Sequence, residues 1–155
     1  GVGGRGVPQV PRLVVEMDRW IKVAKQRQGE LLERLRKFLG DVCGEGDVVL
    51  FGSRARGTHH ALSDWDIAVL TQSGRYHIAV EEFGQVVYIP LASIDEVLAE
   101  SMIALDIASD GQLLCGRGDH WQIYLKKAAQ YIREKRLVKT PSGWYPPPPH
   151  SDQTR

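Results

Sequence analysis

Apolar residues along the chain switch between helix-like and strand-like spacing. Over residues 13–39 they recur three, four or seven positions apart, which predicts one amphipathic helix. Gly40 is expected to end this helix as a C-terminal cap. After a turn at 44–47, the runs 48–51 and 65–70 are short, apolar and rich in β-branched residues, so each predicts a buried strand.

The second half of the chain predicts further strands and helices. Residues 71–90 are ambiguous between a hairpin and a helical turn, apart from 86–89, which predicts a strand. Residues 93–96 match a capping box, so a helix should follow. A short strand is expected at 112–115, and Asp119 is expected to cap a last helix. The expected buried side chains of the first of these two helices are Val97, Leu98, Met102, Leu105 and Ala108.

These elements predict an α/β fold (of the α+β kind) in which a small mixed sheet is covered by helices. The expected order is α-β-α-β-β-α-β-α, and right-handed crossovers would govern any parallel strand pairs. A length of 155 residues suits one domain, which we place at residues 12–140. The Gly- and Pro-rich residues 1–11 are expected to be disordered, and the Pro-rich residues 141–155 are expected to form an extended tail.

The composition is that of an ordinary globular protein, with 43% hydrophobic and 25% charged residues. No apolar run approaches the length that spans a bilayer, and the first residues lack a signal-peptide core, so we expect a cytoplasmic protein with no membrane partner. Cys43 and Cys115 are too few for a metal motif, and they are interpreted as buried thiols or one disulfide.

Charge is segregated along the chain, although the net charge is only +1. Residues 1–39 carry nine Lys/Arg and four Asp/Glu, residues 40–118 carry four and twelve, and residues 119–155 carry seven and three. An acidic centre fits a metal site. Basic end helices keep an RNA-binding protein open as an alternative, although the whole composition makes no case for nucleic acid.

Two carboxylates mark the start of the second predicted strand. Asp64 and Asp66 are two positions apart, so on a strand they point the same way, while the alternating apolar residues point into the core. Paired carboxylates repel each other unless a cation lies between them, and hard oxygen ligands suit Mg²⁺ or Mn²⁺. The upstream turn of Gly52 and Ser53 suits substrate phosphates, because Gly permits close backbone approach and Ser offers a hydroxyl and an N–H.

Together these motifs resemble the nucleotidyltransferase superfamily that shares its fold with DNA polymerase beta, and in particular its minimal prokaryotic branch. The matching pieces stand in the order Gly52-Ser53, Arg56-Gly57 and Ser63-Asp64-Trp65-Asp66-Ile67. The resemblance covers about residues 47–70, with a weaker match to about residue 116.

The resemblance implies roles for six residues. Asp64 and Asp66 would be the catalytic metal ligands, and Gly52 and Ser53 would bind the triphosphate. A guanidinium can fork onto two phosphate oxygens, so Arg56, or as second choice Arg54, would balance the phosphate charge.

The resemblance further implies a metal-dependent transferase that moves a nucleoside monophosphate, with AMP from ATP as first choice, onto an acceptor. Minimal nucleotidyltransferases often pair with small all-helical proteins of the HEPN type, toward which they act as antitoxins, so the resemblance implies a protein hydroxyl as a candidate acceptor. Antibiotic-modifying relatives use a small molecule instead, and a homo-oligomer also remains open.

One feature departs from the family pattern. Active members carry a third carboxylate on the next strand, and laying the pattern over this chain places that position near Val87, which is apolar. Glu81, Glu82 and Asp95 are the nearest acids, and nothing in the spacing selects one of them. The alternative function is therefore a catalytically weak or inactive module that binds nucleotide or partner.

A partner surface is expected on one of the end helices, where the apolar face is wider than one small core needs. The candidates are the first helix around Met17, Trp20 and Ile21, and the last helix around Trp121 and Tyr124.

Overall fold

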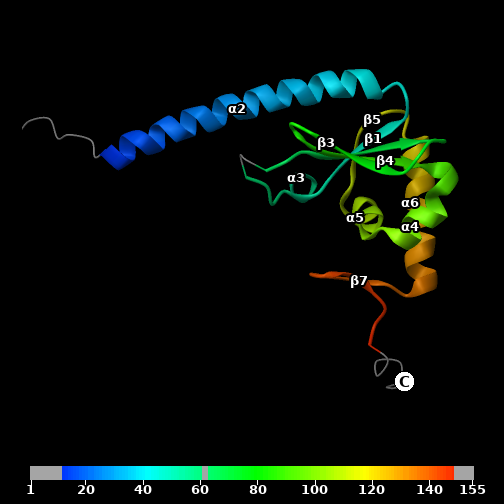
Figure 1. The fold of residues 1–155 in the computed structure, drawn as a ribbon. Helices are drawn as coiled ribbons and strands as arrows, with labels where there is room; N and C mark the ends of the chain where they lie inside the picture. Colours follow the sequence, from blue (N-terminus) through cyan, green and yellow to red (C-terminus); the bar gives the residue numbers. More distant parts are fainter. Residues whose placement is uncertain (1–11, 61–62, 149–155) are drawn as a thin grey trace, which may run out of the picture.

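A five-stranded mixed sheet organises the chain in the computed structural model, which describes residues 12–60 and 63–148 (Figure 1). The strands are β1 (Asp47–Phe51), β2 (Asp66–Thr71), β3 (His77–Glu81), β4 (Gly84–Pro90) and β5 (Gln112–Cys115). The helices are α2 (Arg12–Val42), α3 (Ser53–Arg56), α4 (Ile94–Glu100), α5 (Met102–Asp110) and α6 (Asp119–Lys135), with a short 3₁₀ turn, η1 (Leu91–Ser93). The predicted fold class, a small mixed sheet covered by helices, is confirmed.

Strand directions bring the ends of three strands to one edge of the sheet. The spatial order is β3-β4-β2-β1-β5; β1 runs antiparallel to β2, whereas β2 and β4 are parallel. Phe51 pairs with Asp66, and Ile67 pairs with Val86. The C-terminal end of β1 therefore meets the N-terminal ends of β2 and β4.

Alternation along the strands gives the sheet two apolar faces. One face packs against α2 through Leu35, Val42, Val48, Ile67, Val69, Phe83 and Val86. The other packs against α4, α5 and α6, and includes Val49, Phe51, Ala68, Leu70, Val87 and Ile89. Asp66 alternates with Ile67 and so belongs to the second face.

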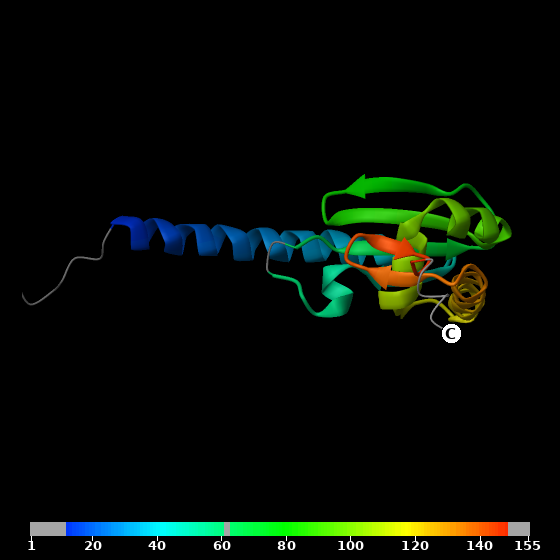
Figure 2. The same cartoon turned by 90° about the horizontal axis from the view of Figure 1, so that it is seen from below.

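Helix α2 is longer than its sequence pattern predicts. It runs through Gly40 to Val42 rather than ending at a glycine cap, because Val42 is buried against the sheet and keeps the last turn in place. Cys43 follows directly and is disulfide-bonded to Cys115 of β5, with the two Cα atoms 5.7 Å apart. The first half of α2 projects away from the rest of the molecule (Figure 2).

The helix predicted after residue 93 is divided into α4 and α5. Ser101 between them has extended backbone angles, and its hydroxyl is 2.9 Å from the hydroxyl of Tyr76. The break changes the helical phase, so Met102 is exposed instead of buried and Ile107 is buried instead. The ambiguous segment before α4 forms the β3–β4 hairpin.

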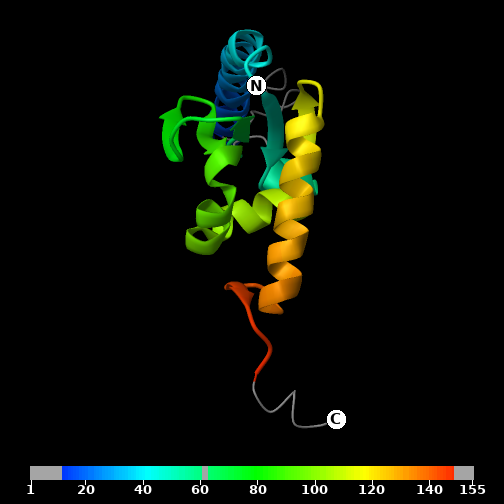
Figure 3. The same cartoon turned by 90° about the vertical axis from the view of Figure 1, so that its right-hand side faces the viewer.

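Helix α6 is capped by a residue that is distant in sequence. The carboxylate of Asp47, at the start of β1, accepts hydrogen bonds from the backbone N–H groups of Gly118 and Trp121, at 3.0 and 2.9 Å. Asp119, the cap expected from the sequence, makes no side-chain cap bond there. Beyond α6 lies a hairpin that the sequence pattern did not predict, β6 (Val138–Thr140) with β7 (Gly143–Tyr145) (Figure 3).

The expectations for residues 1–11 and for the last residues of the tail fall outside the described part of the chain. Among the helices of that part, none combines the length and apolar character needed to cross a membrane.

Candidate active site

The turn between β1 and α3 lies directly against Asp66. Gly52 has φ 76° and ψ −159°, a backbone conformation that only glycine adopts readily. A Cβ atom at this position would lie 2.6 Å from the Asp66 Oδ2 atom. Gly52 is therefore required twice, once by the backbone and once by the neighbouring carboxylate.

Helix α3 is held in place by one of its own side chains, Arg54, and by one from a strand, Gln112. The Arg54 guanidinium donates two hydrogen bonds to the Ser63 carbonyl oxygen, at 3.1 and 3.0 Å, and lies 4.0 Å from the centre of the Trp65 ring. Gln112 of β5 donates to the Ala55 carbonyl oxygen at 2.9 Å. Arg54 thus fastens the loop before β2, so its guanidinium is engaged within the protein.

The two carboxylates of the sequence motif differ in position. β2 begins at Asp66, which is half-buried, whereas Asp64 precedes the strand and is exposed. Burial raises the pKa of the Asp66 carboxyl, and the charge of Asp64 raises it further, although hydrogen bonds from Gln85 and the charge of Arg56 act in the opposite direction. Burial and the neighbouring charge of Asp64 therefore both disfavour the charged form of Asp66.

Gln85, and not Val87, is the residue beside Asp66 on the neighbouring strand. The parallel register that pairs Ile67 with Val86 sets Asp66 next to Gln85, and both the backbone and the side chain of Gln85 hydrogen-bond to the Asp66 carboxylate. Val87 pairs with Ala68 and is fully buried in the core, so we take Gln85 in its place as the candidate third-carboxylate position. The conclusion that this position carries no acid is unchanged, because its occupant is an amide.

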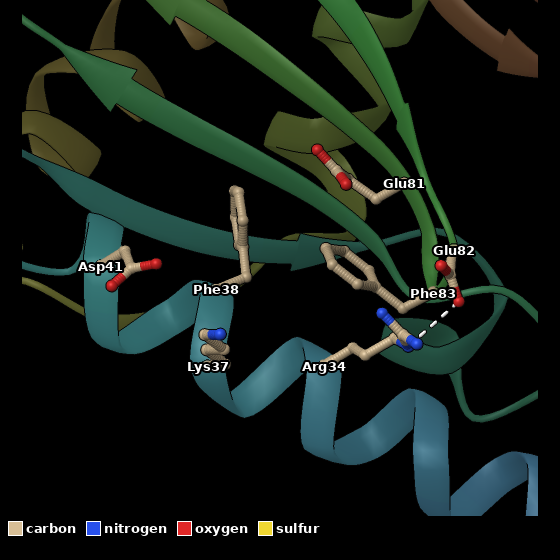
Figure 4. Close-up of a pocket in the computed structure, with 7 residues that line it drawn as sticks. All are labelled: Arg34, Lys37, Phe38, Asp41, Glu81, Glu82 and Phe83. Carbon is tan, nitrogen blue, oxygen red and sulfur yellow. Dashed lines mark ion pairs between the residues drawn. The ribbon is translucent and has the colours of Figure 1, made fainter.

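The three acids considered as substitutes lie elsewhere. Glu82, in the β3–β4 turn, pairs with Arg34 of α2 at 3.0 Å, and Glu81 lines the same hollow between α2 and the hairpin (Figure 4). This hollow is on the α2 face of the sheet, opposite the face of Asp66. Asp95 is in the first turn of α4, which follows the C-terminal end of β4, so it lies toward the other edge.

Arg56 is paired with an acid that no local pattern reveals. Its Nη1 atom lies 3.2 Å from Asp110 Oδ2 at the end of α5, and Lys139 Nζ of β6 lies 3.0 Å from the same oxygen. Burial raises the pKa of the Asp110 carboxyl, but the hydrogen bonds from Lys139 and Arg56 outweigh it and leave the pKa below its ordinary value. The Arg56 side chain remains 46% exposed, so part of its guanidinium faces solvent.

A second group of metal-type ligands lies at the opposite edge of the sheet. The side chains of Asp47, Asp119 and His120 offer atoms within 4.8 Å of one another. Both carboxylate oxygens of Asp47 already accept backbone hydrogen bonds from the start of α6. This group is explained by helix capping.

Comparison with known proteins places the sequence in a described family. Residues 30–139 match the family described as nucleotidyltransferase domain. A relative from Aphanizomenon flos-aquae (strain 2012/KM1/D3), named protein adenylyltransferase MntA, is 35% identical over 109 residues, which cover 60% of this chain and 73% of the relative.

Solved structures with a similar chain include two toxin–antitoxin complexes. One, described as a toxin–antitoxin with AMP-PNP, is 26% identical, covers 67% of this chain and 89% of that chain, and has a TM-score of 0.45. A mutant of the toxin–antitoxin pair MntA–HpeT is 19% identical, covers 66% and 86% of the two chains, and has a TM-score of 0.43.

Proposed function

Because the chain belongs to the nucleotidyltransferase domain family, we propose that it transfers AMP from ATP to a hydroxyl group of a partner protein. The name of its relative, protein adenylyltransferase, supports both AMP as the transferred group and a protein as the acceptor. The proposed partner is a small all-helical protein of the HEPN type, paired with this chain as a toxin with its antitoxin in the cytoplasm. The observation that carries the proposal is the contact between the Gly52 turn and the Asp66 carboxylate, next to Asp64.

The residues around this contact have different roles in the proposed binding of a triphosphate. Ser53, the first residue of α3, offers its hydroxyl to a phosphate oxygen at a point where Gly52 leaves room for close approach. Arg56, held by Asp110, presents its exposed part to the phosphate charge. Arg54 acts indirectly, because its bonds to the Ser63 carbonyl oxygen position the loop that carries Asp64.

A divalent cation fits the paired carboxylates. Asp64 and Asp66 are two hard oxygen ligands, and the charge of Asp64 raises the pKa of the Asp66 carboxyl in addition to the larger effect of burial. Mg²⁺, or Mn²⁺ in its place, commonly takes one or two carboxylates and completes its shell with substrate phosphates and water. When bound, the cation would neutralise the repulsion between these carboxylates and the triphosphate.

In the transfer step the acceptor oxygen forms a bond to the α-phosphorus of ATP, and the bond from that phosphorus to the bridging oxygen breaks, so pyrophosphate leaves. The acceptor proton passes to water, because the side chain beside Asp66 is the amide of Gln85 and accepts a proton only very weakly. Transfer by the isolated chain is therefore expected to be slow.

A second candidate function follows from the same residue. Gln85 hydrogen-bonds to Asp66 and leaves two carboxylates, rather than three, at the centre of the site. Such a site suits a module that binds one nucleotide and holds its partner without turnover. Measured transfer to the partner distinguishes the two functions.

The proposal is tested by titration calorimetry with the analogue α,β-methylene-ATP, in which the bond that breaks during transfer is replaced. Binding is expected with Mg²⁺ and absent in EDTA. Asp66→Asn is expected to abolish the Mg²⁺-dependent part without unfolding the domain, because it removes a ligand and relieves repulsion with Asp64.

The matched control is Glu81→Gln, which removes an exposed carboxylate on the other face of the sheet and should leave binding unchanged. Undiminished binding of the analogue in EDTA, or equal losses in the two variants, would contradict the assignment. Incubation of the chain and a HEPN-type partner with ATP labelled at the α-phosphate then reports transfer to the protein.

A further inference from the structure

The apolar stripe of α2 extends beyond the sheet that covers it. In the second half of the helix the stripe packs on the sheet through Leu31, Leu35, Phe38 and Val42. At 3.6 residues per turn the same stripe continues toward the N-terminus through Ala24, Ile21, Trp20 and Met17. We call residues 16–28 the projecting segment, because they lie past the edge of the sheet (Figures 1 and 2).

The projecting segment exposes large apolar side chains. Trp20 is 71% exposed, Met17 54% and Ile21 49%. Trp20, Ile21, Val23, Ala24 and Arg27 line a shallow groove along it. A contiguous exposed apolar surface of this kind marks an interaction site.

Charged side chains flank the apolar stripe on both sides, and acids and bases follow the same order along the helix on each side. By the helical repeat, Glu16 and Arg27 lie on one flank of the stripe, while Asp18 and Lys25 lie on the other. Each flank thus has its acid toward the N-terminus and its base toward the C-terminus.

We propose that the projecting segment binds, in antiparallel orientation, to the same segment of a second copy of this chain. In an antiparallel pair each flank faces the equivalent flank of the other helix, so acids meet bases on both sides. The pair of Glu16 with Arg27 and the pair of Asp18 with Lys25 are both centred midway between Ile21 and Lys22. Two independent flanks therefore select one register.

This register also places a large side chain opposite small ones. Trp20 of one copy lies opposite Val23 of the other and faces the groove that Val23 and Ala24 line. Burial of Trp20 and its neighbours supplies the attraction. Exposed ion pairs contribute little to affinity, so the flanking charges mainly fix the register and the orientation.

The proposed pairing does not depend on side chains that lack partners within their own chain. Arg27 also lies 3.5 Å from Glu30 and 3.6 Å from Glu82 within its own chain, and it would share its guanidinium with the second copy. In a parallel pair, acids would face acids and bases would face bases on both flanks, which disfavours that orientation.

The resulting dimer is expected to be weak. The 13 residues of the projecting segment give about 20 Å of helix contact. This length corresponds to an interface at the small end of the specific range, for which we expect a dissociation constant of roughly 10–100 μM.

Sedimentation equilibrium of the full chain, loaded from about 5 to 500 μM, tests the proposal across that range. Trp20→Ala is expected to weaken association at least about tenfold, because it removes the largest buried side chain of the interface. Asp18→Lys and Lys25→Asp should each weaken it, since each sets like charges on one flank. The double variant Asp18→Lys with Lys25→Asp should restore it.

Lys127→Asp, an equal change of charge on the exposed side of α6, is the matched control and should leave association unchanged. Circular dichroism of each variant checks that α2 remains helical. A chain that stays monomeric at all concentrations, a dimer insensitive to Trp20→Ala, or a double variant no better than either single variant would overturn the proposal. Nucleotide binding by the same variants is measured separately, so failure of the dimer leaves the proposed enzymatic function untouched.

Discussion

Replacing Gln85 with glutamate tests how the site handles a third acid. The change keeps the length of the side chain, removes the amide donor that bonds to Asp66, and adds a second negative charge beside it. A hydrogen bond to a charged group contributes about 1.5–3 kcal/mol. Because Asp66 is only half-buried, solvent screening reduces this contribution, and we expect Gln85→Glu to lower the free energy of unfolding by about 1–2 kcal/mol without metal.

The assay is thermal unfolding at pH 7, with and without Mg²⁺. For a domain of this size each kcal/mol shifts the midpoint by about 2–4 °C, so the metal-free shift should be about 2–8 °C. Mg²⁺ should recover most of it, because a third carboxylate strengthens the cation site. AMP transfer to the partner protein should rise by about 10²–10⁴-fold, the usual effect of a general base.

Two variants complete the experiment. Gln85→Ala removes the hydrogen bond without adding charge, so it should lose stability without gaining a Mg²⁺ response. Val87→Asp should fail to fold, because Val87 is fully buried in the core and an unpaired carboxylate there has no partner. If Val87→Asp folds and transfers AMP faster while Gln85→Glu does neither, the third-carboxylate position has been assigned to the wrong residue.

Three further variants probe the surroundings of the site. Gly52→Ala should lower the free energy of unfolding by about 1–3 kcal/mol and weaken nucleotide binding. Gly57→Ala has a similar positive φ but open space around its Cβ, so equal loss of nucleotide affinity in both would contradict a specific contact with the carboxylate. The pKa of Asp110 is lowered in the folded state, so its stabilising contribution is fully present above the unfolded pKa of about 4 and is lost as pH falls through the folded pKa. Asp110→Asn should therefore reduce the loss of stability at acid pH. Urea-unfolding curves of the original chain and the variant that superimpose at every pH would refute this. Cys115→Ser removes the disulfide that closes a loop with a sequence separation of 72, and it should lower the free energy of unfolding in urea by about 4 kcal/mol. Dithiothreitol should lower the stability of the original chain by a similar amount and leave that of the variant unchanged.

Local sequence patterns were sufficient for the fold class and for the neighbourhood of the site. The Gly52 turn and Asp66 lie within one hairpin-like unit of the chain, and the antiparallel pair of β1 and β2 brings them together. Apolar residues alone located both strands and the long first helix, because β1 and β2 are buried on both faces and the second half of α2 is buried on one. The motif was readable because its parts are close in sequence.

Contacts between distant segments were not readable in the same way. That Gln85 rather than Val87 lies beside Asp66 depends on the parallel register of β2 and β4, which no single-strand pattern encodes. Asp110 and Lys139 reach Arg56 from α5 and β6. Asp47 caps α6 across more than seventy residues, so the nearer Asp119 was the natural but incorrect choice from the sequence.

The interaction of Gln85 with the half-buried Asp66 explains why an amide is compatible with the site. A second acid beside the half-buried Asp66 carboxylate would add like-charge repulsion and so raise the cost of the metal-free fold. Gln85 instead donates a hydrogen bond to Asp66 and stabilises the metal-free fold, and under the proposed function it leaves this position without a proton acceptor. Stability without metal and rapid turnover are therefore opposed at this one position, as they are at many active sites. With Gln85 at this position, we expect the domain to be stable without metal and its turnover to be slow.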